Sequence, residues 1–136
     1  MSSSQPVLFV SHGSPLSALG GDGLSTVWTA LAARLSRPAA ILAVSAHWES
    51  GVPLLGGDAQ PETIHDFGGF PAALRRLEYP APGAPDLARR LCERLSGTGL
   101  VAGVDGARGL DHGIWVPLRH LFPAADVPVV PLAVQP

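Results

Sequence analysis

Apolar residues in this sequence gather in short runs that are separated by turns rich in glycine and proline. Residues 7–10 read Val-Leu-Phe-Val, and residues 39–46 form a longer run of the same kind. Short apolar runs with such boundaries are typical of strands that are buried on both faces. Between the two runs, apolar residues recur at three- and four-residue spacing over residues 24–35, which predicts a helix ended by Pro38. Strand, helix and strand in this order form the repeating unit of a parallel sheet.

The second half of the chain continues the alternation of strands and helices. Residues 85–95 place leucines on one helical face, and Asp111 is a plausible N-cap for a second helix, with Pro117 in its first turn. Three further segments predict strands, at 52–55, 100–104 and 127–134. We expect the first of these to lie at the edge of the sheet, because Pro53 has no N–H to donate. The predicted fold is an α/β domain over residues 1–136, with a mainly parallel central sheet flanked by helices.

Two of the predicted strands end on a histidine. His12 follows the run at 7–10, and His47 closes the run at 39–46. Ligands of parallel sheets bind beyond the carboxyl ends of the strands, and neighbouring strands lie about 4.8 Å apart. Two imidazoles at adjacent strand ends can therefore share a metal ion, with bonds of about 2.0–2.2 Å. The alternative is that each histidine is a hydrogen-bonded structural residue.

Three other histidines differ in their surroundings. His112 lies at a loop-to-helix junction, where an imidazole with a pKa near neutrality suits acid–base chemistry. His65 and Phe67 occur in a loop of mixed polar and aromatic character, which is typical of a substrate pocket. His120 lies within a helical pattern, so we expect it to be structural or exposed.

A carboxylate could complete the predicted metal site, because mononuclear iron sites often combine two histidines with one carboxylate. Glu49 lies two residues after His47 and shares its side if the strand continues, although a surface glutamate is the simpler interpretation. Asp66 and Glu62 are weaker candidates. The sequence contains neither a Gly-x-Ser-x-Gly motif nor a glycine-rich phosphate loop after a strand, so serine hydrolase and nucleotide-binding readings have no support.

Composition narrows the class of protein. The 136 residues are 46% hydrophobic and 15% charged, with a net charge of −2, which indicates one globular domain and gives no electrostatic case for nucleic acid or an anionic membrane. The single cysteine, Cys92, excludes an internal disulfide and suits the reducing cytoplasm as a small core residue. The first apolar run is too short for a signal peptide or a membrane span. These observations predict a cytoplasmic protein.

Taken together, six segments give the sequence a specific resemblance. They are LFVSHGSP, ILAVSAHWE, PETIHDFGGFP, LEYPAPG, GLDHGIWVPL and VPVVPLAVQP. In this order they resemble the 4,5-DOPA extradiol dioxygenase family, the class III (LigB-type) ring-cleaving dioxygenases. The resemblance implies a LigB-like fold, a catechol substrate and dioxygen, with Fe(II) as the expected metal and Zn(II) as an alternative occupant of the same site.

The resemblance also implies roles for particular residues. His12 and His47 would be metal ligands, and His112 would be a catalytic residue beside the metal or the substrate. His65 and Phe67 would belong to a loop that shapes the substrate pocket. Family members are longer than this chain, so the chain is expected to be the N-terminal part of a LigB-like domain whose other half carries further histidines.

Two other classes of function remain open at this point. One is a zinc-dependent hydrolase at the same edge of the sheet, and the other is a non-catalytic metal-binding or interaction module of the same fold. No helix follows the strand at 127–134, so we expect an exposed sheet edge there, which would favour a homo-oligomer.

Overall fold

A computed structural model describes residues 4–136 of the chain. Its elements follow the sequence in the order η1 (Pro15–Leu19, a 3-10 helix), α1 (Gly23–Ala32), β1 (Ile41–Glu49), β2 (Leu54–Gly56), α2 (Ala72–Arg75), α3 (Pro85–Ser96), β3 (Gly103–Asp105), α4 (His112–Leu121) and β4 (Val129–Val134). Among these helices, none is long and apolar enough to cross a membrane.

The four strands form one mixed sheet in the order β1-β4-β2-β3. Strands β1 and β4 pair in parallel, as do β2 and β3, whereas β2 and β4 meet antiparallel at Leu55 and Leu132. This confirms the predicted α/β class with a mainly parallel sheet. Two predictions about edges are wrong, because β4 and β2 are both interior strands. Pro53 precedes β2, so its missing N–H removes no ladder bond within that strand.

A proline inside β4 explains why position 56 of the neighbouring strand is a glycine. Pro131 lies within β4 and is almost fully buried. A Cβ atom added at Gly56 in the neighbouring strand would overlap the Pro131 ring. The absence of a side chain at position 56 is therefore what lets β2 approach β4 at this point.

The strand predicted at residues 7–10 does not form. The segment has no assigned secondary structure, and Val7 and Phe9 are fully exposed. Its two ends are still held, because the Gln5 side chain hydrogen-bonds Ser36 and the His12 ring reaches His47 of β1. The apolar pattern predicts burial on both faces, but these side chains are not covered within residues 4–136, and so the burial that would favour a strand is missing.

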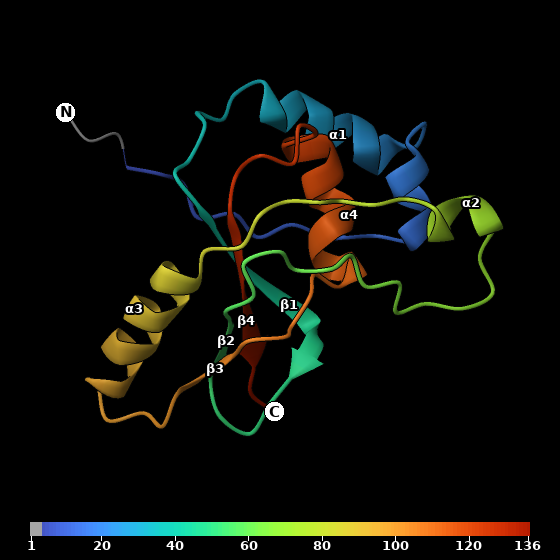
Figure 1. Ribbon diagram of the computed structural model, residues 1–136. Helices are drawn as coiled ribbons and strands as arrows, with labels where there is room; N and C mark the ends of the chain where they lie inside the picture. Colours follow the sequence, from blue (N-terminus) through green and yellow to red (C-terminus); the bar gives the residue numbers. More distant parts are fainter. Residues whose placement is uncertain (1–3) are drawn as a thin grey trace.

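Helices cover both faces of the sheet. Val129 of β4 belongs to the larger core cluster, which includes Trp28 of α1 and Trp115 of α4, whereas Val130 packs with Ala88 of α3. Successive residues of a strand point to opposite faces, so α4 and α3 lie on opposite sides of β4, as Figure 1 shows. Strand β1 leads from this layered core to one end of the sheet, where α4 begins.

Candidate metal centre

Three histidines from three separate segments converge at this end of the sheet. His12 lies in the segment before η1, His47 lies near the end of β1, and His112 is the first residue of α4. One ring nitrogen from each lies within 4.8 Å of the others. The Nε2 atoms of His12 and His47 are 3.0 Å apart. Two nitrogens bound at right angles to one ion, with bonds of about 2.1 Å, are separated by about 3.0 Å, so the pair fits adjacent ligands of one metal.

The presentation of His47 depends on an irregularity in β1. Ser45 pairs with Ala133, but Glu49 pairs with Val134, so the residues between them bulge out of register. The bulge interrupts the strict alternation of faces, and the His47 backbone N–H turns back to the Ser45 hydroxyl over 3.1 Å. His47 is exposed as a result. Glu49 is exposed as well and is not part of the ligand cluster found within residues 4–136, which consists of histidines alone.

A buried carboxylate joins β1 to the start of α4. Asp111 is the N-cap of α4, as predicted, and its Oδ1 accepts from the Gly113 N–H at 2.9 Å. The same oxygen accepts from the Ser45 hydroxyl at 2.6 Å, and Oδ2 accepts from Arg108 at 3.0 Å. This network fixes the distance between the two elements that carry His47 and His112.

Asp66 holds the His112 ring from the other side. Its Oδ1 lies 2.8 Å from His112 Nδ1 and also accepts from the His112 backbone N–H at 3.0 Å. The side chain of His112 is only 8% exposed, and that of Asp66 is 27% exposed. Burial by itself raises the pKa of Asp66, but the hydrogen bonds and charge of His112 outweigh it, so the pKa is lowered. Asp66, a weak candidate for a metal ligand, thus contacts a histidine of the cluster instead of joining it.

The electrostatic surroundings favour neutral imidazole at His12. Desolvation lowers its pKa first, and the neighbouring rings of His112 and His47 lower it further, whereas Asp111 and Asp66 offset part of the effect. Neutral imidazole is the form that binds a metal ion, so the donor set suits a divalent transition metal.

The two residues expected to shape a substrate pocket lie at different distances from the cluster. The Phe67 ring meets the His112 ring edge-on, with centroids 5.7 Å apart. The His65 Nε2 is 2.8 Å from the Leu77 carbonyl oxygen, and its ring packs near Trp115 at 5.7 Å. The structure therefore brings Phe67, and not His65, against the histidine cluster.

Comparison with known proteins identifies the family. A sequence model described as the catalytic LigB subunit of aromatic ring-opening dioxygenase matches residues 6–136. The chain belongs to the LigB family. It is 44% identical over 134 residues to the 4,5-DOPA dioxygenase extradiol of Escherichia coli (strain K12), covering 98% of this chain and 49% of that relative. The Beta vulgaris protein of the same name is 43% identical over 131 residues, covering 93% of this chain and 49% of the relative.

A solved structure agrees with this assignment. The crystal structure of uncharacterized protein JW3007 from Escherichia coli K12 matches with a TM-score of 0.64 and 34% identity, covering 83% of this chain and 41% of that chain. The LigB-like fold expected from the sequence is thereby confirmed. The chain spans about half the length of the curated relatives that it matches.

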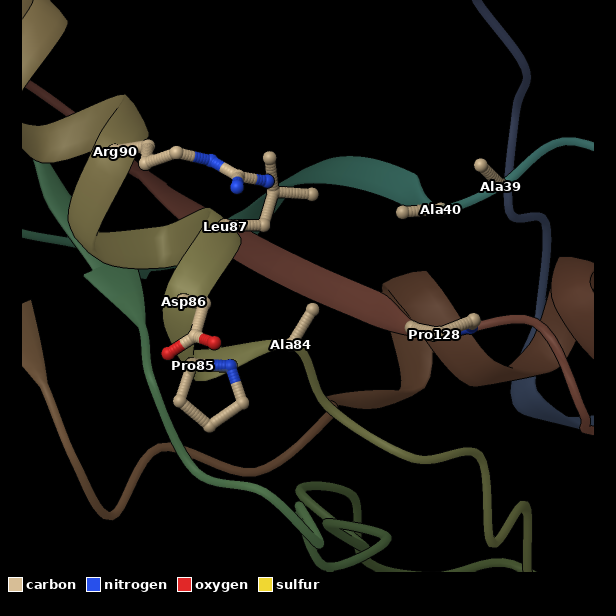
Figure 2. A pocket seen from close by; sticks show the side chains of 8 residues that line it. All are labelled: Ala39, Ala40, Ala84, Pro85, Asp86, Leu87, Arg90 and Pro128. Carbon is tan, nitrogen blue, oxygen red and sulfur yellow. The ribbon is translucent and has the colours of Figure 1, made fainter.

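One open pocket of this LigB-family chain lies away from the histidines. It sits where α3 begins and where β1 and β4 start, whereas His47 is near the carboxyl end of β1 (Figure 2). Its lining consists of Ala39, Ala40, Ala84, Pro85, Asp86, Leu87, Arg90 and Pro128. None of the five histidines lines it, so this pocket is separate from the candidate metal centre.

His120 lies outside the cluster, as expected for a structural residue. Its Nε2 is 2.8 Å from the Ser17 carbonyl oxygen, and its ring stacks on Trp28 with centroids 5.6 Å apart. It joins α4 to η1 and α1.

The sequence signals that would have revealed the supporting contacts of the site are weak: a serine two residues before His47, and an aspartate next to His65.

Proposed function

We propose that this chain supplies the metal-binding part of an extradiol ring-cleaving dioxygenase, which opens a catechol-type ring with dioxygen. Residues 1–136 would form the N-terminal part of a longer LigB-like domain. The observation that carries the proposal is the 3.0 Å approach of the His12 and His47 Nε2 atoms, with His112 beside them, in a chain of the LigB family. A cytoplasmic location, which the free thiol of Cys92 suits, belongs to the same proposal.

His12 and His47 are the proposed metal ligands. Both present imidazole nitrogens to the same space, and the lowered pKa of His12 favours the neutral ring that a metal requires. Fe(II) is the expected metal, and Zn(II) can occupy the same histidines because its affinity for nitrogen ligands is higher. A metal bound there supplies a Lewis acid with open positions for catechol oxygens and for dioxygen.

His112 is the proposed catalytic residue. Its Nδ1 is engaged by Asp66, and its ring lies 4.1 Å from the His47 ring between centroids. From this position it can take a proton from a hydroxyl group of a catechol held at His12 and His47. Phe67 borders the same space with an aromatic ring, and His65 packs near Phe67 at 6.0 Å, so we assign both to the substrate pocket.

Oxygen consumption tests this function. Because the chain spans about half of its relatives, the assay uses both the chain alone and a chimera that joins it to the second half of the Escherichia coli relative. With Fe(II) and a catechol, we expect the chimera to consume one dioxygen per catechol and to yield a product opened beside the two hydroxyl groups. The His47→Ala chimera should lose this activity, whereas a His120→Gln chimera should retain it.

Two outcomes would contradict the proposal. A correctly folded, iron-loaded chimera that consumes no oxygen but hydrolyses esters or amides with Zn(II) would favour the zinc hydrolase. A chain that binds no metal at His12 and His47 would favour an interaction module of LigB-like fold.

A further inference from the structure

We propose that Asp66 is a positioning residue that holds His112 in a single tautomer, with the proton on Nδ1 and the lone pair of Nε2 directed toward His12 and His47. This inference deepens the proposed function, since it rests on His112 as the group that accepts a proton there. It concerns a residue that neither the ligand cluster nor the pocket includes.

The contact between Asp66 and His112 fixes both the backbone and the ring of the histidine. One carboxylate oxygen, Oδ1, accepts from the His112 backbone N–H at 3.0 Å and lies 2.8 Å from His112 Nδ1. The backbone bond sets the place of the carboxylate relative to the start of α4, and the Nδ1 contact then restricts the orientation of the His112 ring. The His112 side chain is only 8% exposed, so water competes little for these bonds.

The loop that carries Asp66 is anchored on the segment before α4. Thr63 and Leu110 form an isolated parallel bridge, with the Ile64 N–H donating to the Leu110 carbonyl at 2.8 Å. The Trp115 indole N–H of α4 donates to the Ile64 carbonyl oxygen at 2.9 Å. Asp66 follows two residues later, so its carboxylate is held at a set distance from the first residue of α4.

The chemistry of the pair then selects the tautomer. An ionised carboxylate only accepts hydrogen bonds, so a neutral imidazole facing it must carry its proton on Nδ1. The other nitrogen, Nε2, is then an acceptor. The opposite tautomer would place an N–H toward His12 and His47, where a base must receive a proton, and would leave two acceptors facing each other at Asp66.

Histidine ring nitrogens can be read directly by nuclear magnetic resonance of the metal-free, ¹⁵N-labelled chain. At about pH 8, above the ordinary histidine pKa of about 6.5, neutral rings give distinct signals for protonated and unprotonated nitrogens. The His112 signals are assigned by their loss in His112→Gln. We expect a protonated Nδ1 and an unprotonated Nε2 for His112 in the unmodified chain.

Three variants separate positioning from general stability. Asp66→Asn should keep the tautomer, because the amide Oδ1 can accept the same two bonds, whereas Asp66→Ala should convert His112 to a mixture of tautomers. Asp58→Ala is the matched control, since Asp58 also caps a turn, at Gln60, without contacting a histidine. It should leave the His112 signals unchanged.

The result that overturns the proposal needs no variant. A His112 ring with its proton on Nε2 in the unmodified chain contradicts it, as does an unchanged tautomer in folded Asp66→Ala. Because these measurements involve neither metal nor turnover, they are independent of the oxygen assay. If the expected tautomer is found but no oxygen is consumed, the proposed function alone is rejected. If oxygen is consumed but His112 has the other tautomer, the role of Asp66 alone is rejected.

Discussion

Tyr79, the only tyrosine of the chain, has a hydroxyl group that the fold removes from water. Its side chain is buried, and its hydroxyl donates to the Phe122 carbonyl oxygen at 2.9 Å. Burial, with a smaller contribution from the negative charge of Asp126, raises the pKa of Tyr79 to about 12. The protonated form is therefore favoured by the fold.

A pH titration of tyrosinate absorbance follows from this environment. We expect the folded chain to titrate near pH 12 and the chain unfolded in denaturant to titrate near the ordinary value of 10.0. Since the folded-state pKa is the higher one, the stabilisation is complete below about pH 10 and is lost as the pH rises through about 12. Tyr79→Phe, which removes the signal, is the control. Equal titration of the folded and unfolded chains would contradict the burial of this hydroxyl.

Residue-level predictions from the sequence succeeded where the signal is local. Asp111 as a helix cap follows from the residue types around one helix start, and the structure confirms it. The contacts of Ser45 with Asp111 and of Asp66 with His112 join residues that are 66 and 46 positions apart. No periodicity or spacing encodes such pairs, since they form only when β1, the 63–71 loop and α4 are packed together.

At the level of elements, apolar pattern gave the existence of most helices and strands but not all of their limits. The strand predicted at 100–104 is observed at Gly103–Asp105. The helix that Asp111 caps begins at His112, so Pro117 lies in its interior and not in its first turn as predicted. The strand at 7–10 failed because pattern reports a tendency to be buried, whereas a ladder also requires neighbours that bury it.

Gly113, the second residue of α4, offers a sharp test of how this helix meets β1. A Cβ atom added there would lie 2.5 Å from the Ser45 hydroxyl oxygen and 3.0 Å from His47 Cδ2. Although alanine is the better helix former, we expect Gly113→Ala to destabilise the chain by about 1–3 kcal/mol through overpacking, and to weaken metal binding by displacing His47.

The matched control is Gly23→Ala. Gly23 is the first residue of α1, and an added Cβ atom meets nothing within 4 Å. It should leave both stability in urea and metal affinity nearly unchanged. If Gly113→Ala behaved like Gly23→Ala, the close contact between α4 and β1 would be wrong.

For the molecule as a whole, the sequence indicated the α/β class and the approach of His12 to His47, although His12 ends no strand, and it could not give the order of the strands. The antiparallel contact of β2 with β4 inserts β2 into the sheet and leaves β1 at one edge. That order depends on which apolar surfaces pack together, such as Gly56 against Pro131, and not on the pattern within any one strand.

The convergence of His12, His47 and His112 is likewise a property of the whole molecule. The segment that carries His12 is not paired with the sheet as a strand. The approach of His12 to His47 is therefore a contact between two side chains. A metal ion held by His12 and His47 would join their two segments and stabilise the folded chain by mass action. We therefore expect folding and metal binding to be thermodynamically coupled.

Calorimetric titration of the metal-free chain with Zn(II), and with Fe(II) under anaerobic conditions, tests the central claim most directly. We expect one ion per chain. His47→Ala should weaken binding by more than about 100-fold, because the loss of an outer hydrogen-bonding partner alone costs about 10- to 100-fold. His120→Gln, which changes a histidine outside the cluster, should bind like the unmodified chain. No binding by the unmodified chain, or equal affinity in folded His47→Ala, would contradict a metal centre at these histidines.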